Sequence, residues 1–276
     1  MKNLVDAAWV KEHIEEIRVV DCRFNLANRA EGQEKYRQDH IPGAVYFNLE
    51  EDLSGTVSIH GGRHPLPSVE QLTASLQKAG ISNGTTIVAY DGGEASFASR
   101  FWWLLKYVGH EKVYVLDGGY KEWLKHGYPV DDIIPAYDES NYQVQVVNDI
   151  CASYEEVKEV SSNETAEAIL IDSREEQRYK GINEPIDKKA GHIPGAVNKV
   201  WTDALSEGRF KSGEEQSNRF SEYDKNTPLI VYCGSGVTAS PNFLALKEAG
   251  FKNVKLYPGS FSDWISYGDN PVGTKK

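Results

Sequence analysis

The sequence of 276 residues has little or nothing of several features, and each scarcity excludes a class of protein. Its three cysteines, Cys22, Cys151 and Cys233, are too few and too scattered for a disulfide framework, and none forms a C-x-x-C metal or redox pair. It lacks an apolar run of about 18 residues, the length that spans a membrane, and its start lacks a signal-peptide pattern. We therefore expect a cytoplasmic protein with reduced thiols and no membrane partner.

Basic residues are also scarce relative to acidic ones. There are 30 Lys and Arg against 41 Asp and Glu, so the formal net charge is −11. Because nucleic acids and anionic membranes bind basic faces, this balance predicts that neither is a partner. It leaves room for a small local basic site that binds an anionic substrate. Hydrophobic residues make up 40% of the chain, which is enough for real cores and argues against disorder.

The chain repeats four segments in the same order, and such self-similarity indicates a duplicated domain. The matched segments, first half against second, are VVDCRF (19–24) with LIDSRE (170–175), DHIPGAVYF (39–47) with GHIPGAVNK (191–199), IVAYDGG (87–93) with IVYCGSG (230–236), and VLDGGYKEW (115–123) with LYPGSFSDW (256–264). We predict one domain over residues 1–130, an extended polar linker over 131–152 and a second domain over 153–276.

Within each half, short apolar runs alternate with helical patterns. The runs TTIVAYD and PLIVYC are β-branched and apolar on both faces, which suits parallel strands covered by helices on both sides. Helical patterns follow at 98–109 and 239–250, and each is closed by a glycine. We therefore predict two tandem α/β domains, each with a central, mostly parallel sheet flanked by helices.

Ligands of such sheets bind at the carboxyl ends of the strands, and Cys233 lies at one of these ends. Gly234 and Gly236 let the backbone curl with its N–H groups inward, and Pro241 fits the first turn of the next helix. The start of that helix points partial positive charge at the loop, so a thiolate at Cys233 is stabilised and reactive. Asp91 occupies the equivalent place in the first half.

Three other chemistries fit this loop less well. A cysteine phosphatase needs C-x5-R, but Ala239 stands at the arginine position. The stretch GSGVTA matches a dinucleotide fingerprint, but the following strand has no acidic residue for a ribose hydroxyl. Ser235 is flanked as C-G-S-G, so it is not the nucleophile of a G-x-S-x-G elbow.

These motifs together resemble the two-domain rhodanese-type sulfurtransferases over almost the whole chain. In that family the second domain carries the catalytic cysteine, which corresponds to Cys233, and the first domain is a degenerate partner. The loop CGSGVTA is the form typical of 3-mercaptopyruvate sulfurtransferases, because thiosulfate-preferring rhodaneses have basic residues where Gly234 and Ser235 stand. A small dianion such as thiosulfate is favoured by cations inside the loop, which are missing here.

The resemblance also implies roles for individual residues. Arg178 matches the substrate-binding arginine of the family, and Arg63 with His64 matches a loop near the entrance of the site. The segment before GHIPGA contains no second arginine, so Lys188 or Lys189 is expected to take its role. Its form EPIDKKAGHIPGA is similar to that of bacterial thiosulfate enzymes, which leaves thiosulfate as an alternative donor.

The mechanism that we expect is covalent. The Cys233 thiolate takes sulfur from a small-molecule donor, and the resulting persulfide is held by backbone N–H groups from Gly234 through Gly236 and Val237 to Thr238. The hydroxyl groups of Ser235 and Thr238 orient the donor or move a proton. The acceptor is cyanide or a thiol such as thioredoxin, and no metal or cofactor is implied. A persulfide carrier that serves a protein partner is the alternative.

Some of the remaining candidates are expected to be structural. Cys22 lies inside an apolar strand pattern, and free cysteines there usually fill cores as small hydrophobic residues. His40 and His192 precede a rigid Ile-Pro-Gly turn in both halves, including the half without a cysteine, so we assign them to architecture. We expect Asp172 to hold the fold by binding Arg174 or loop amides.

Overall fold

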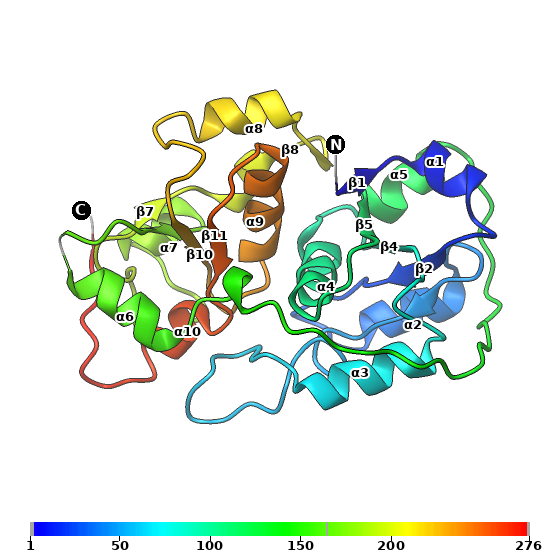
Figure 1. Ribbon diagram of the computed structural model, residues 1–276, viewed down its shortest axis with the longest axis horizontal. Helices are drawn as coiled ribbons and strands as arrows, with labels where there is room; N and C mark the ends of the chain where they lie inside the picture. Colours follow the sequence, from blue (N-terminus) through cyan, green and yellow to red (C-terminus); the bar gives the residue numbers. More distant parts are fainter. Residues whose placement is uncertain (1–2, 164, 275–276) are drawn as a thin grey trace. The chain divides into compact units, whose positions relative to one another are not determined.

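The computed structural model describes residues 3–163 and 165–274, and the chain forms two compact units (Figure 1). The first unit comprises Met1–Gly55, Pro67–Val147 and Glu207–Phe210, and the second comprises Thr56–Leu66, Asn148–Ser206 and Lys211–Lys276. Each unit therefore includes a short segment that the chain order alone assigns to the other half. The segment 56–66 matters most, because it belongs to the unit that carries Cys233.

The first unit is built on a five-stranded parallel sheet. Its elements are β1 (Leu4–Val5), α1 (Ala7–Glu12), β2 (Arg18–Asp21), α2 (Glu31–Gln38), β3 (Val45–Tyr46), α3 (Val69–Lys78), β4 (Ile87–Tyr90), α4 (Ser96–Tyr107), β5 (Val113–Leu116) and α5 (Gly119–Lys125). The strand order is β1-β5-β4-β2-β3 and every pair is parallel. The central strand β4 is buried along its whole length, as its β-branched composition predicts.

The second unit repeats this plan with four parallel strands in the order β11-β10-β6-β7. Its elements are η1 (Asn148–Ile150), α6 (Tyr154–Ser162), β6 (Ile169–Asp172), α7 (Glu176–Lys180), β7 (Val197–Asn198), η2 (Trp201–Ala204), α8 (Gly213–Arg219), β10 (Leu229–Tyr232), α9 (Ala239–Glu248), β11 (Val254–Leu256) and α10 (Ser260–Trp264). The short strands β8 (Leu205–Ser206) and β9 (Arg209–Phe210) follow η2 in the chain.

Helices cover both faces of each sheet. In the first unit, α4 packs on β4 and β5, while residues of α1, α2 and α5 share a core on the other face. In the second unit, α9 packs on β10 and β11, and α6, α7 and α10 form the opposite core (Figure 1). The predicted helices are present at Ser96–Tyr107 and Ala239–Glu248, and Gly109 and Gly250 follow their ends with φ of 84° and 85°. The predicted tandem α/β fold is confirmed.

The repeated D-x-R motif forms a buried ion pair in each unit. Asp172 accepts hydrogen bonds from the backbone N–H of Arg174 at 3.0 Å and from its Nη2 at 2.6 Å. Both side chains are at most 1% exposed. Asp21 and Arg23 make the same pair in the first unit. The expectation that Asp172 holds the architecture is therefore confirmed.

The repeated histidines also have structural contacts. His192 stacks on Tyr179 with ring centroids 4.0 Å apart, and its Nδ1 lies 2.7 Å from the Tyr179 carbonyl oxygen. His40 makes the same two contacts with Tyr36, with the ring centroids at 4.3 Å and the hydrogen bond at 2.7 Å. These contacts lock the turn that leads into β3 or β7, as expected for residues kept in both halves.

Two of the three cysteines occupy structural positions. Cys22 is 1% exposed at the end of β2, and burial raises the pKa of its thiol well above the ordinary value. It fills the core, as predicted. Cys151 forms an isolated parallel bridge with Leu256, the position that β1 takes beside β5 in the first unit. None of the three cysteines, which all lie in the described residues, forms a disulfide.

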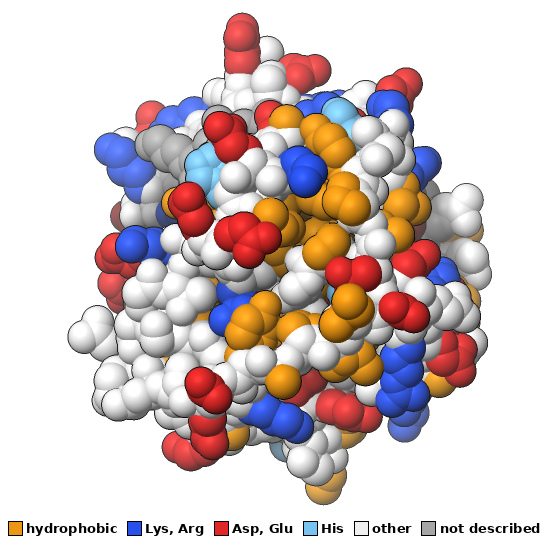
Figure 2. Space-filling view, turned by 90° about the vertical axis from the view of Figure 1, so that its right-hand side faces the viewer, with side chains coloured by type: hydrophobic (Ala, Val, Ile, Leu, Met, Phe, Trp, Pro, Cys, Tyr) orange, Lys and Arg blue, Asp and Glu red, His pale blue; other side chains and the backbone are white. Residues whose placement is uncertain are grey.

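On the face shown in Figure 2, basic side chains lie apart from one another, and hydrophobic side chains gather between scattered acidic ones. Among the residues that the structure describes, none of the helices has both the length and the apolar character needed to cross a membrane.

Replacing Asp172 with Ala tests the contribution of the buried ion pair. The change leaves the guanidinium of Arg174 without its main partner in the interior, so we expect a loss of about 3–5 kcal/mol in the free energy of unfolding. Glu176→Gln is the matched control, because Glu176 is 65% exposed in its ion pair with Lys180 and should cost at most about 1 kcal/mol. Denaturant unfolding measures both, and equal losses would contradict the structural role of Asp172.

Candidate active site

Cys233 lies at the end of β10, in the loop that leads directly into α9. Its side chain is 1% exposed, and the backbone N–H of Gly236 donates a hydrogen bond to its Sγ at 3.1 Å. Gly236 has a φ of 78°, and a β-carbon there would lie 2.3 Å from the Pro258 carbonyl oxygen, so the turn requires glycine. The loop therefore curls around the sulfur, as its two glycines predict.

The corresponding loop of the first unit shows what this kind of curl binds. The carboxylate of Asp91 takes the place of the thiol and accepts four backbone hydrogen bonds. The donors are the N–H groups of Gly93 and Ala95 at 3.0 Å, and of Phe97 and Ala98 at 3.1 Å. The strand-to-helix loop of this fold is thus a cradle of amides for a negative group.

The first turn of α10 fixes the cysteine loop from the other side. Ser260 Oγ accepts a hydrogen bond from the Cys233 N–H at 3.1 Å, and the Phe261 N–H donates to the Cys233 carbonyl oxygen at 3.0 Å. The Ser262 N–H donates to the Gly234 carbonyl oxygen at 2.9 Å. The start of α10, which lies in the repeated segment 256–264, therefore holds the backbone of Cys233 and Gly234.

The same helix anchors the segment 56–66. The Gly61 N–H donates to Asp263 Oδ1 at 2.6 Å, and the Arg63 N–H donates to Ser262 Oγ at 3.1 Å. His60 stacks on Tyr267 with centroids 4.0 Å apart. These contacts bring His64 to the cysteine loop, where its Nδ1 lies 2.8 Å from Ser235 Oγ. His64 and Ser235 are both buried, so the pair is shielded from solvent.

Two guanidinium groups meet the loop at Gly234. A β-carbon at Gly234 would lie 2.8 Å from Arg63 Nη2 and 3.3 Å from Arg178 Nη2. Burial lowers the pKa of Arg63, and the positive charge of Arg178 lowers it further, whereas negative charge at Cys233 raises it. Two cationic side chains therefore lie beside the thiol even though the chain as a whole is acidic.

Carboxylates balance these arginines. Arg178 Nε donates to Glu184 at 3.0 Å, and Glu184 also binds Arg174 Nη1 at 3.2 Å. Asp187 bridges the two arginines of the loop, because its Oδ2 lies 2.9 Å from Arg178 Nη2 and its Oδ1 accepts from Arg63 Nη1. The sequence analysis did not predict Glu184 and Asp187. Both lie in the segment EPIDKK (184–189), in which only the two lysines were considered.

The other predicted residues divide between the cysteine loop and positions outside it. Val237 is buried and Thr238 half-buried at the start of α9. Lys188 is exposed and lines a pocket next to Arg63, whereas Lys189 Nζ donates to the Gly268 carbonyl oxygen at 3.3 Å. The second cation at Gly234 is thus Arg63, from the segment 56–66.

A pocket of about 500 Å³ opens beside Arg63 and Asp187. Its walls combine these charged groups with apolar and small polar side chains, which are Val57, Ser58, Ile59, Gly62, Ile186, Lys188, Ser262, Ile265 and Ser266. It borders the cysteine loop through Arg63 and Ser262, which both contact Gly234.

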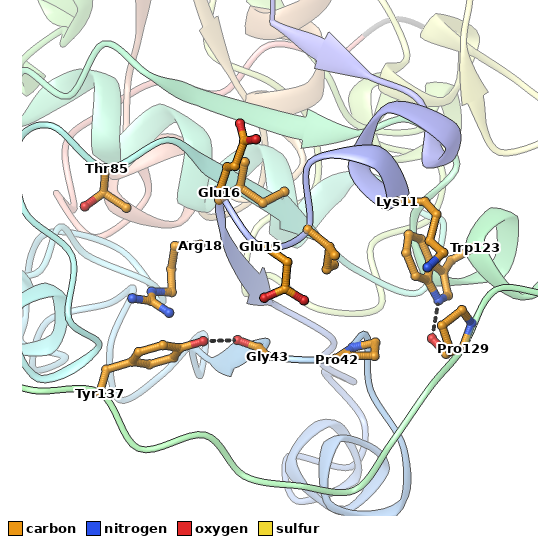
Figure 3. A pocket seen from close by; sticks show the side chains of 12 residues that line it. Lys11, Glu15, Glu16, Arg18, Pro42, Gly43, Thr85, Trp123, Pro129 and Tyr137 are labelled. Carbon is orange, nitrogen blue, oxygen red and sulfur yellow. Dashed lines mark hydrogen bonds between the residues drawn. The ribbon is translucent and has the colours of Figure 1, made fainter.

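A pocket of about 580 Å³ in the first unit lies among Lys11, Glu15, Arg18 and Tyr137 (Figure 3). Its polar groups are partly engaged with each other, because the Tyr137 hydroxyl donates to the Gly43 carbonyl oxygen at 2.9 Å. Among the described residues, none of those that line it is a cysteine or a histidine. In residues 3–163 and 165–274, no group of three or more His, Cys, Asp or Glu side chains is arranged to hold a metal ion.

Comparisons with known proteins agree with this geometry. The model of the rhodanese-like domain matches residues 6–126 and 153–267. A probable 3-mercaptopyruvate sulfurtransferase from Pseudomonas aeruginosa is 40% identical over 93% of this chain and 92% of its own. A thiosulfate sulfurtransferase from Gallus gallus is 33% identical over 95% of this chain and 93% of its own.

Solved structures show the same architecture. The crystal structure described as that of a 3-mercaptopyruvate sulfotransferase from Escherichia coli is 31% identical and has a TM-score of 0.84. The match covers 95% of this chain and all of that one. The predicted pair of rhodanese-like domains is therefore confirmed.

Replacing Gly236 with Ala tests the cradle around Cys233. The positive φ and the nearby Pro258 carbonyl oxygen force the loop to shift, so we expect the Gly236 N–H to leave the sulfur and Cys233 to be alkylated more slowly by iodoacetamide. We also expect a loss of about 1–3 kcal/mol in stability. Gly268→Ala is the control, because nothing lies within 4 Å of its added carbon. Unchanged alkylation of the Gly236 variant would contradict the role of this amide.

Proposed function

We propose a covalent sulfur-transfer reaction for this chain, which belongs to the rhodanese-like family of two-domain sulfurtransferases. The proposed donor is 3-mercaptopyruvate, and the proposed carrier is a persulfide on Cys233. The observation that carries the proposal is the convergence of one backbone amide and two guanidinium groups on the loop of a single buried cysteine.

The first half-reaction breaks the carbon–sulfur bond of the donor. The Cys233 thiolate attacks the thiol sulfur of mercaptopyruvate, an Sγ–S bond forms, and the electron pair of the C–S bond passes to the carbon as the enolate of pyruvate. The enolate takes one proton, and the new persulfide, which is acidic, gives one up. Protons and electrons therefore balance without an oxidant or a reductant.

The loop stabilises the persulfide anion. Its outer sulfur carries negative charge, which the Gly236 N–H and the start of α9 favour. The first unit supports this assignment, since four backbone amides of the equivalent loop donate to the carboxyl group of Asp91. We propose that the N–H groups of Gly234, Val237 and Thr238 complete the cradle once the outer sulfur is present.

The arginines and the His64–Ser235 pair act on the donor. Arg178 and Arg63 are positioned to hold its carboxylate, because both guanidinium groups border Gly234. The Ser235 hydroxyl, held by His64 at 2.8 Å, is the proposed route for the proton that reaches the leaving enolate. We propose that Thr238 orients the donor.

The second half-reaction transfers the outer sulfur. An acceptor thiolate attacks it, and the Cys233 thiolate leaves in its original state, which gives a ping-pong reaction. We propose a cellular thiol such as reduced thioredoxin as the acceptor and the cytoplasm as the compartment, because three cysteines that form no disulfide suit a reducing environment.

Steady-state turnover with two donors tests the proposal. Cyanide serves as acceptor, and 3-mercaptopyruvate is compared with thiosulfate. We expect mercaptopyruvate to be preferred by at least about tenfold in kcat/KM, equivalent to about 1.4 kcal/mol, since no basic residue follows Cys233 to attract a dianion. Cys233→Ser should abolish turnover with either donor.

Each other outcome selects another function. A preference for thiosulfate would make the chain a thiosulfate sulfurtransferase, the name carried by its relative from Gallus gallus. Formation of a persulfide without turnover to small acceptors would make it a sulfur carrier for a protein partner. Turnover that survives Cys233→Ser would refute the covalent mechanism.

A further inference from the structure

We propose that Asp187 determines which donors enter the site, because its carboxylate occupies the two guanidinium groups that an anionic donor needs. This inference rests on the proposed function and adds a specificity-determining residue to it. Asp187 competes with the donor for Arg63 and Arg178, and this competition penalises a donor with two negative charges more than a donor with one.

The geometry of the bridge supports this role. The two carboxylate oxygens of Asp187 bind different arginines, Oδ1 the Nη1 of Arg63 and Oδ2 the Nη2 of Arg178. The Asp187 side chain is 2% exposed, and its Oδ2 would lie 3.6 Å from a β-carbon at Gly234. An internal carboxylate therefore sits next to the cysteine loop, in the position expected for the carboxylate of a donor.

The charges around the loop also favour this role. Six side chains of alternating sign follow one another through ion pairs, and they are Asp172, Arg174, Glu184, Arg178, Asp187 and Arg63. Three acids and three bases leave the cluster neutral, and the Cys233 thiolate makes the site negative. A neutral cluster does not attract a dianion, whereas the same cluster without the charge of Asp187 has a net charge of one positive unit.

The arginines are held in place independently of Asp187. Arg178 lies in α7 and keeps its Nε bonds to Glu184, and the backbone N–H of Arg63 is fixed by Ser262. Asp187 instead lies in residues 182–190, which form neither a helix nor a strand. The carboxylate can therefore leave while both guanidinium groups stay.

The gain in affinity on neutralising Asp187 should depend on the charge of the ligand. Coulomb energy scales with the charge of the ligand, so removing one negative unit should multiply the affinity of a dianion by the square of the factor found for a monoanion. If neutralisation of Asp187 strengthens monoanion binding by about threefold, it should strengthen dianion binding by about tenfold.

Equilibrium binding separates this inference from the reaction itself. Pyruvate is the monoanion probe and thiosulfate the dianion probe, and both are titrated calorimetrically at low salt into protein with Cys233→Ser, where no sulfur transfer follows. Adding Asp187→Asn should raise the affinity for pyruvate about threefold and for thiosulfate about tenfold, and added salt should reduce both gains.

Glu175→Gln is the matched control. Glu175 lies 3.9 Å from Arg178 Nη1 and is 59% exposed, so this change removes the same charge near the same arginine without emptying the bridge. We expect less than about a twofold change with it, because solvent screens the pair. Asp187→Ser should likewise raise the affinity for thiosulfate more than the affinity for pyruvate. This variant decides the case if the Asn variant fails to fold.

Two results would overturn the inference. Equal gains in the Asp187 and Glu175 variants would show that net charge alone matters, and weaker anion binding in Asp187→Asn would show that Asp187 positions the arginines. The proposed function fails separately, through absent turnover with both donors, because the anion affinities of the Cys233→Ser protein do not depend on the reaction.

Discussion

A line of six ion-paired side chains connects the sheet of the second unit with the cysteine loop. It begins at Asp172, which is fully buried at the end of β6, and ends at Arg63, which is 34% exposed. Each interior member has a partner on both sides, so it keeps one ion pair when the other partner is lost. Arg178, which lies beside the cysteine loop, is thus connected through Glu184 to the buried Asp172–Arg174 pair of the D-x-R motif.

The start of α10 supplies the second constraint. Its backbone and Ser260 hold the cysteine loop, while Ser262 and Asp263 hold the segment 56–66. One helix turn thus sets the position of Cys233 together with those of Arg63 and His64. Both units have this strand-to-helix loop, but the loop of the first unit surrounds the carboxyl group of Asp91 and that of the second unit surrounds the thiol of Cys233. Of the two equivalent positions, the second unit therefore has the one with a thiol.

The sequence predicted features that depend on local pattern. The strands, the glycine-ended helices, the cysteine loop and the pairing of Asp172 with Arg174 all follow from periodicity, repeats or neighbours in the chain. Local pattern does not predict contacts between residues that are far apart in the sequence. His64 contacts Ser235 and Arg63 contacts Asp187, and each pair is separated by more than a hundred positions. Asp187 was overlooked because a carboxylate is not an expected neighbour of a predicted anion site, and only the structure shows that it pairs with Arg63 and Arg178.

The central claim of this account is that Cys233 carries the sulfur covalently. The most direct measurement is the intact mass of the protein after exposure to 3-mercaptopyruvate without an acceptor, followed by peptide mapping. The account predicts a gain of one sulfur atom on the peptide that contains Cys233, and its loss when a thiol is added. No gain in mass, or the same gain in the Cys233→Ser variant, would contradict it.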